Sequence, residues 1–286
     1  FPGRRFGYLP EGSIFDQRGP MCFPHEVSPW ILMSVLNSTL YHGLFLSLTP
    51  EREWTVGDLG RIPWVDELAN LSELAELAHD QYKLVKALRS YDPTSPYYGG
   101  PAILPGDRSF FYDHPYTNEE AIDPKDINQR VEANQSIASA VRAVETRKRE
   151  IQQRLESLAN SIDDLVYEHL QIGPDDREEI QTEIQLRTGT NPESNDQQAE
   201  AVSIDDDILR EHAKELLHYC VLTEVRESND VSVAIPSIDN RPDIVERIAG
   251  RLEQYYGEET PARLTEIDSL LGSKQADTDA YPNIRT

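Results

Sequence analysis

The chain has 286 residues, enough for one or two domains with a hydrophobic core. It carries 51 acidic and 27 basic residues, and a net charge of -24 argues against nucleic-acid binding driven by total charge. Its two cysteines, Cys22 and Cys220, stand far apart, which argues against a disulfide framework or a cysteine-based zinc site.

The charge is distributed unevenly along the chain. Residues 1–61 hold five arginines and six acidic residues, a sum of -1, so the other residues carry -23. Only six of the 27 basic residues are lysine, and surface-wide acidity with few lysines is typical of a salt-adapted, halophilic cytoplasm. In molar salt, counterion release contributes little to DNA binding, so local patches become more informative than total charge.

The N-terminal residues lack the basic, apolar and small-residue pattern of a signal peptide, so we expect a cytoplasmic protein. The chain begins at Phe1 rather than methionine, which favours a fragment of a longer reading frame. No charged residue stands between Glu26 and Glu51, a stretch long enough to suggest a membrane span. Polar residues such as Asn37 and His42, and the lack of flanking positive charges, favour a buried helix instead.

The first part of the chain predicts loops and short strands followed by a buried helix. Glycines and prolines interrupt residues 1–28, between apolar residues that favour short strands. Ser28 is a good N-cap and Pro29 suits the first helical turn, so a helix is predicted from there to about residue 48. Further short strands are predicted at residues 54–56 and 59–64.

The middle of the chain predicts two helices separated by a loop. Residues 66–90 carry apolar residues at steps of three and four, and residues 91–117 are rich in proline. From Ile137 to Leu165, apolar residues alternate steps of four and three, which is the seam of a coiled coil. Lys148 is the polar position in this seam, where it either fixes the register or extends its ammonium to solvent.

The last part of the chain predicts a polar linker followed by short helices. A helix is expected after Gly173, whose acidic neighbours suit a first turn, and residues 187–203 are polar and expected to be mobile. Further helices are predicted at residues 205–219, from Pro242 to Gly257, and ending at Gly272. A strand is expected at residues 231–235.

Catalytic signatures are missing from the sequence. It has no glycine-rich nucleotide loop, no nucleophile elbow and no HExxH helix, and its seven histidines are scattered. Residues 95–98, Ser-Pro-Tyr-Tyr, approach the motif with which amino-group DNA methyltransferases hold a flipped base, but they lack the second proline. A proline-rich turn is the simpler interpretation, and we expect neither a catalytic residue nor a metal site.

Residues of the types that contact DNA occur in two places. In the N-terminal loops they are Arg4, Arg5, Gln17 and Arg18. Arginine can bind guanine bidentately and glutamine can bind adenine. On the heptad helix they are Arg142, Arg147, Lys148 and Arg149, which can follow a phosphate backbone. Ordinary surface residues and the outer face of a coiled coil are the alternative interpretations.

Several short motifs follow one another in an informative order. Residues 11–20 read Glu-Gly-Ser-Ile-Phe-Asp-Gln-Arg-Gly-Pro, residues 36–38 Leu-Asn-Ser, and residues 56–63 Val-Gly-Asp-Leu-Gly-Arg-Ile-Pro. This order resembles the region after the catalytic domain in PglX-type methyltransferases, the adenine-specific DNA methyltransferases of BREX phage-defence systems. These enzymes are relatives of type IIG restriction-modification enzymes. The Leu-Asn-Ser helix is also similar to type I specificity subunits, in which a coiled coil follows the recognition domain.

The C-terminal part is similar to the tail of the same family. The matching stretches are residues 217–220, Pro236, and residues 243–245, 255–259 and 270–272. Three features depart from the family. Glu-Val-Arg-Glu at residues 224–227 replaces a Gly-Arg-aromatic stretch, the final tyrosine-rich stretch is truncated, and the catalytic and cofactor motifs are absent. The resemblance therefore covers the C-terminal part of such an enzyme without its catalytic domain.

The resemblance implies an enzyme that transfers a methyl group from S-adenosylmethionine to adenine N6 after flipping the base. This chain would read DNA sequence without holding a cofactor, and would not methylate alone. Its implied partners are duplex DNA, the missing N-terminal methyltransferase domain and other defence-system proteins, with no membrane. The alternatives are a stand-alone specificity-like DNA-binding protein and a helical protein-interaction module.

The expected fold class is α+β and mostly helical. It begins with the end of a target-recognition domain, which contains short strands, at residues 1–65. A coiled-coil-like helical spacer follows at residues 66–185, and a flexible linker at 186–203. A small helical C-terminal domain at residues 204–272 and a disordered tail at 273–286 complete the chain.

Overall fold

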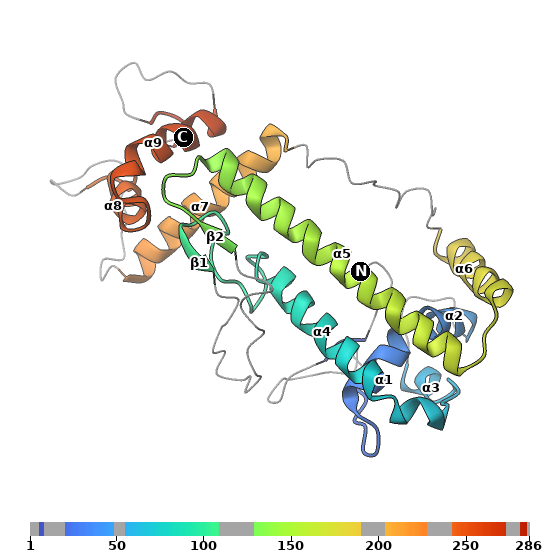
Figure 1. Cartoon of the computed structure of the whole chain (residues 1–286). Coiled ribbons are helices and arrows are strands. Elements are labelled where there is room, and N and C mark those ends of the chain that lie inside the picture. The colour runs from blue at the N-terminus through green and yellow to red at the C-terminus, as the bar shows by residue number, and fades with distance from the viewer. Residues whose placement is uncertain are drawn as a thin grey trace. The chain divides into compact units, whose positions relative to one another are not determined.

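A computed structural model describes residues 6–8, 21–48, 55–108, 129–189, 204–227, 242–272 and 281–284 (Figure 1). In these residues the chain is mostly helical, as the sequence predicts. It forms two compact units, each assembled from separate stretches. Unit 1 comprises residues 1–86, 113–119 and 151–199, and unit 2 comprises residues 87–112, 120–150 and 200–286.

Unit 1 is built from helices. It contains α1 (Pro29–Asn37), α2 (Thr39–Leu48), α3 (Val56–Leu59), the 3-10 helix η1 (Asp66–Asn70) and α6 (Pro174–Thr188). It also holds most of α4 (Ser72–Arg89) and the second half of α5 (Ile137–His169). Both of these helices continue into unit 2, so the predicted spacer at residues 66–185 is divided between the two units.

Unit 2 combines helices with a short two-stranded ladder. Its remaining elements are β1 (Gly106–Arg108), β2 (Gln129–Val131), α7 (Asp206–Glu227), α8 (Ile244–Tyr256), the 3-10 helix η4 (Gly257–Glu259) and α9 (Thr260–Leu271). The strands are antiparallel, with Gly106 opposite Val131. The sequence predicted a loop where β1 forms.

The predicted uncharged helix begins as expected but is broken at Ser38. Helices α1 and α2 meet there at an angle of 68°. The Ser38 hydroxyl donates to Val35 O at 2.7 Å, and its backbone is extended. Asp163 of α5 then accepts from Thr39 N at 2.7 Å and from Thr39 Oγ1 at 2.5 Å, which satisfies a free amide in the first turn of α2.

No single helix in the described ranges has the length and apolar character to span a bilayer, although the bent pair α1–α2 meets both criteria when taken together.

The strands predicted at residues 54–56 and 59–64 are wrong in the part of these segments that the structure describes. Thr55 caps the short helix α3 instead: Thr55 Oγ1 accepts from Asp58 N at 3.3 Å, and Asp58 Oδ2 accepts from Thr55 N at 2.9 Å. This reciprocal capping box outweighs the strand preference of the neighbouring apolar residues. The strand predicted at residues 231–235 lies outside the described residues.

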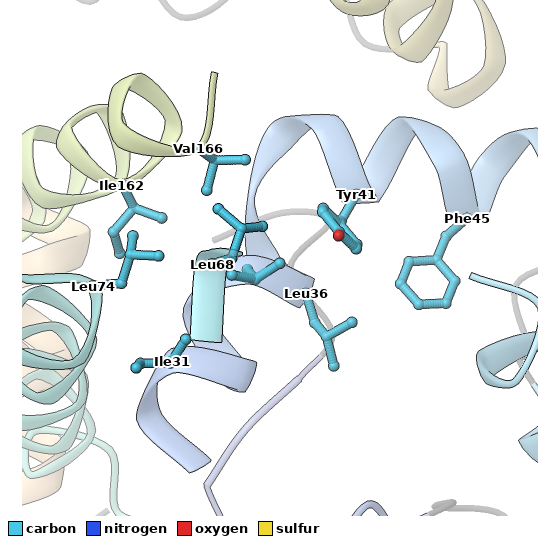
Figure 2. Packing of buried hydrophobic residues seen from close by; sticks show 9 residues of the cluster. Ile31, Leu36, Tyr41, Phe45, Leu68, Leu74, Ile162 and Val166 are labelled. Carbon is cyan, nitrogen blue, oxygen red and sulfur yellow. The ribbon is translucent and has the colours of Figure 1, made fainter. Parts of the chain in front are cut away.

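A hydrophobic cluster holds unit 1 together (Figure 2). Tyr41 and Phe45 enter it from α2 and Leu68 from η1, while Ile162 enters from α5. The remaining buried members are Ile31, Val35, Leu36, Leu74 and Val166. Burying an apolar side chain of this size contributes roughly 1.5–3 kcal/mol. The two helices of the predicted uncharged stretch, α1 and α2, are therefore core elements of unit 1.

Helix α6 packs along α2 (Figure 1). Gly43 permits the close approach, because a Cβ there would lie 3.3 Å from Ile180 Cγ2. Arg187 Nη1 donates to Leu46 O at 2.9 Å and so satisfies a carbonyl of the last turn of α2. The helix begins at Pro174, as the acidic residues after Gly173 predict.

The buried positions of α5 follow the predicted heptad seam in the first half of the helix. In the second half, some of them move to neighbouring positions that are not part of the seam. Ile151 and Leu155 are buried as predicted, but Leu158 is only partly covered and Ala159 is buried instead. A straight helix has about 3.6 residues per turn, so a seam with a repeat of 3.5 rotates by roughly 20° per heptad. The second half of α5 packs on α1, η1 and α4 within unit 1.

Helices α7, α8 and α9 pack on one another in unit 2 (Figure 1). Cys220 of α7 and Leu252 of α8 are fully buried, and burial raises the pKa of the Cys220 thiol to about 12. Helix α8 has a capping box between Asp243 and Glu246 and ends before Gly257, as predicted. Helix α7 extends to Glu227, eight residues beyond its predicted end.

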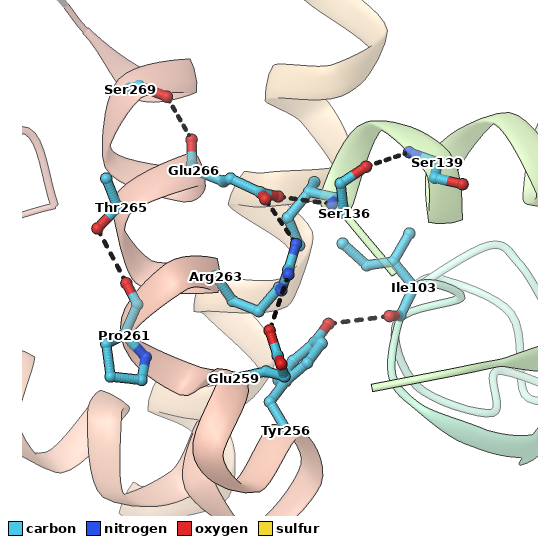
Figure 3. Close-up of polar contacts among 11 residues, drawn as sticks. Ile103, Ser136, Ser139, Tyr256, Glu259, Pro261, Arg263, Thr265, Glu266 and Ser269 are labelled. Atoms are coloured by element: carbon cyan, nitrogen blue, oxygen red, sulfur yellow. Dashed lines mark hydrogen bonds and ion pairs between the residues drawn. The ribbon is translucent and has the colours of Figure 1, made fainter. Parts of the chain in front are cut away.

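Glu266 connects α9 with the start of α5 and is paired with the buried Arg263 (Figure 3). Arg263 lies between Glu259 at 3.2 Å and Glu266 at 2.5 Å. The other oxygen of Glu266 accepts from Ile137 N at 2.7 Å, which satisfies an amide in the first turn of α5. Tyr256 Oη also donates to Ile103 O at 2.9 Å. These contacts fasten the C-terminal helices to the rest of unit 2.

Candidate nucleic-acid interface

The N-terminal segment 6–8 is fastened to unit 1 by Asn37. Asn37 Oδ1 accepts from Phe6 N at 3.1 Å, and Asn37 Nδ2 donates to Phe6 O at 2.9 Å. The side-chain amide therefore pairs with the main chain of Phe6 as a neighbouring strand would. The Leu-Asn-Ser motif thus has three structural roles: Leu36 fills the core, Asn37 holds the N-terminal segment, and Ser38 marks the bend.

The same segment enters a group of aromatic side chains. Tyr8 stacks on Trp30 of α1, with ring centroids 4.6 Å apart and planes 20° apart. Trp30 also lies 5.2 Å from Tyr82 and 4.8 Å from His79, both on α4. We call these four half-buried residues the aromatic cluster. The Lys86 ammonium, 5.7 Å from the centre of the Tyr82 ring, places a cation beside the cluster.

The C-terminal half of α4 is locally basic, which the sequence analysis overlooked. Residues 81–91 contain Lys83, Lys86 and Arg89 and no acidic residue, although the whole chain has a net charge of -24. Lys83 lies 3.3 Å from Asp80, while Arg89 is exposed. One explanation of these basic residues is structural, because cations are favoured at any helix C-terminus. The other is functional, because aromatic rings combined with basic side chains are a common surface for nucleic acids.

The four N-terminal candidates, Arg4, Arg5, Gln17 and Arg18, lie outside the described residues. Arg4 and Arg5 directly precede Phe6 in the chain. Asn37 fastens the residue that follows them in the sequence, Phe6.

The four candidates on α5 do not form one exposed row. Arg142 is exposed, and Arg149, seven residues on, lies on the same helix face and is half-buried. Arg147 forms a pair with Glu150 at 2.8 Å, and Lys148 points to a different neighbour. Of the four, Arg142 is the most accessible to a phosphate group.

Lys148 belongs to a partly buried group of polar side chains in unit 2. Its ammonium lies 2.8 Å from Glu145 Oε1 and 5.3 Å from the centre of the Tyr91 ring. The same Glu145 oxygen lies 3.1 Å from His212 Nε2 of α7. The hydrogen bond with His212 and the pair with Lys148 lower the pKa of Glu145 to about 2, although burial opposes this. Glu145, the partner of the polar residue in the heptad seam, therefore connects α5 to α7.

The same group includes the near-miss methyltransferase motif. Tyr98 Oη donates to Glu215 Oε1 at 2.6 Å, and Glu215 Oε2 lies 3.7 Å from His212 Nδ1. Residues 95–98 form a turn in which Tyr98 N donates to Ser95 O at 3.1 Å. The proline-rich turn is confirmed, and the Tyr98 side chain holds α7.

Asn37→Ala should loosen the N-terminal segment without emptying the core. The variant loses two hydrogen bonds to Phe6, so we expect the free energy of unfolding to fall by about 1–2 kcal/mol. Chemical denaturation in molar salt measures this. Ser47→Ala is the control, because its exposed hydroxyl bonds only to Gly43 O of its own helix. Equal stability of the two variants would contradict the role of Asn37.

Neither metal ligation nor similarity to known proteins assigns a function to this surface. Within the described ranges, no group of three or more His, Cys, Asp or Glu side chains could hold a metal ion. No family model, curated protein or solved structure matches the chain. Its function must therefore be argued from its own residues.

Proposed function

We propose that this chain is the DNA-recognition and C-terminal part of a site-specific DNA N6-adenine methyltransferase. The enzyme would serve a cytoplasmic phage-defence system of the BREX or restriction-modification type. The whole enzyme would transfer a methyl group from S-adenosylmethionine to adenine in duplex DNA. The catalytic domain and the cofactor site would lie outside these 286 residues. The chain alone is expected to bind DNA without methylating it.

The anchoring of residues 6–8 is the observation that carries this proposal. Base readout requires loops that a rigid scaffold positions. Asn37 holds Phe6 and Trp30 stacks on Tyr8, so both support the segment that directly follows Arg4 and Arg5 in the sequence. The asparagine belongs to the Leu-Asn-Ser motif of the family resemblance, so its structural role fits a segment that frames DNA-reading loops.

The local charge of α4 gives separate support. Lys86 lies beside Tyr82 of the aromatic cluster, and Lys83, Lys86 and Arg89 all fall in a stretch of the chain without acidic residues. Short-range contacts to phosphate persist at high salt better than long-range attraction, because salt screens distant exposed charges first. A local basic and aromatic surface therefore suits DNA binding by an otherwise acidic protein.

A helical protein-interaction module is the second candidate. Leu222 and Val225 are 58% and 50% exposed and lie three residues apart on α7. Adjacent exposed apolar side chains on one helix face are typical of a surface that binds another protein. Direct measurement of DNA binding separates the two candidates.

Duplex-DNA binding at the native salt concentration is the decisive experiment. A pool of random-sequence duplexes is incubated with the chain in molar potassium chloride, and bound DNA is recovered and sequenced over several rounds. Enrichment of a defined sequence supports the proposal. Recovery of no duplex above a protein-free control would favour the interaction module.

Arg18→Ala should weaken binding to the selected sequence by about 5–100-fold, because a bidentate contact to guanine contributes roughly 1–3 kcal/mol. Fluorescence anisotropy with the selected duplex and a scrambled duplex measures both affinity and preference. Lys214→Ala is the matched control, since it removes one positive charge from an exposed position on α7. Unchanged affinity and preference in Arg18→Ala would exclude Arg18 as a base contact.

A further inference from the structure

Residues 281–284 fold back onto α9, although the sequence predicts disorder throughout the tail. Asn283 N donates to Asp268 Oδ1 at 2.7 Å, and Ile284 N donates to the same oxygen at 2.9 Å. The Asn283 side chain donates to Asp268 Oδ2 at 2.9 Å. One carboxylate of α9 therefore accepts three hydrogen bonds from two successive tail residues.

The site on α9 is shaped for this segment. Asp268 is only 9% exposed, and a buried carboxylate is costly unless donors surround it. Gly272 leaves room for the tail, because a Cβ there would lie 2.4 Å from Asn283 Oδ1. Tyr281 has a φ of 58°, an uncommon backbone conformation for a residue other than glycine. We call Asp268 and Gly272 the α9 notch.

We infer that the α9 notch is a peptide-binding site whose intramolecular ligand is the segment 281–284. It recognises a chain that presents two successive backbone amides and an asparagine side chain to one carboxylate. The asparagine side chain has the required length and ends in a donor. An aspartate at the same position would place a second negative charge beside Asp268 and would be repelled by it. The site therefore selects asparagine at position 283.

Attachment keeps the site filled. A ligand joined by a short connection has an effective concentration on the order of millimolar, so a separate peptide competes poorly with it. Three partly buried hydrogen bonds, two of them from backbone amides, give modest affinity to a short peptide on its own. A free peptide should bind measurably only when the attached segment has been released.

The test uses the full chain throughout. Asn283→Asp releases the attached segment and leaves the notch intact, and a fluorescent peptide of residues 279–286 serves as the probe. We expect the peptide to bind the Asn283→Asp chain at least tenfold more tightly than the unaltered chain, as measured by anisotropy. A peptide with the same Asn283→Asp change should not bind either chain.

The control for the notch is the double variant Gly272→Ala/Asn283→Asp, in which the added methyl group blocks the site. It should lose peptide binding while its circular dichroism and unfolding curve match those of the single variant. Equal peptide binding by the unaltered and Asn283→Asp chains, or by the single and double variants, would overturn the inference. Fast amide hydrogen exchange at Ile284 in the unaltered chain would overturn it independently of any variant.

Discussion

Replacing Phe45 with alanine should destabilise the protein by about 3–5 kcal/mol, as expected for a buried aromatic side chain. Phe45 is fully buried in the unit 1 cluster (Figure 2). Its ring lies 5.4 Å from that of Phe6. Its removal leaves a cavity between α2 and the N-terminal segment. Chemical denaturation in molar salt, followed by circular dichroism, measures the loss.

The control for this variant is Phe23→Ala. Phe23 is 62% exposed, so the same chemical change should alter the free energy of unfolding by about 0.5 kcal/mol or less. A similar loss in both variants would show that Phe45 does not support the core. If the proposed function is correct, Phe45→Ala should also weaken DNA binding under conditions where it remains folded, because Phe6 loses its packing partner.

The second large effect concerns Glu145 and acid. The hydrogen bond with His212 and the pair with Lys148 lower its pKa from 4.5 to about 2 in the folded protein. A carboxylate with a lowered pKa stabilises the fold above its unfolded pKa and loses that contribution as pH falls through the folded value. Glu145 should therefore contribute about 2–3 kcal/mol at neutral pH, which disappears between roughly pH 4.5 and 2.

Glu145→Gln is the informative variant, because it keeps the shape of the side chain and removes the titrating group. We expect it to be less stable than the unaltered chain at pH 7 and nearly equal to it near pH 2. Glu150→Gln is the matched control, since Glu150 pairs with Arg147 on the same helix but is 54% exposed. A constant difference between Glu145→Gln and the unaltered chain from pH 7 to pH 2 would contradict this role.

Local sequence signals predicted many helix ends well. Ser28 and Pro29 begin α1, and Gly257 ends α8. These signals succeed because a helix terminus is satisfied by residues within one turn of it. The prediction failed at residues 54–56, where Thr55 and Asp58 form a capping box that the apolar pattern obscured.

The candidate site was less predictable. The types of residue that contact DNA were recognisable in the N-terminal loops and on α5, but their accessibility was not. Lys148 was a candidate for phosphate, whereas its ammonium lies against Glu145 and Tyr91. The basic stretch of α4 is present in the sequence, but the apolar periodicity of that helix is the stronger pattern and predicts only its buried face.

The sequence by itself determined the helical character of the protein, most helix ends and the burial of the uncharged helix predicted after Ser28. Only the tertiary structure decided that Asn37 fastens Phe6. It likewise decided that Asp163 accepts a hydrogen bond from the first amide of α2, at Thr39, which lies 124 residues earlier in the chain. It also decided that the heptad side chains of α5 pack within the same chain. Helix formation depends on neighbours within a few residues, whereas a polar side chain finds its distant partner only when packing brings the two together.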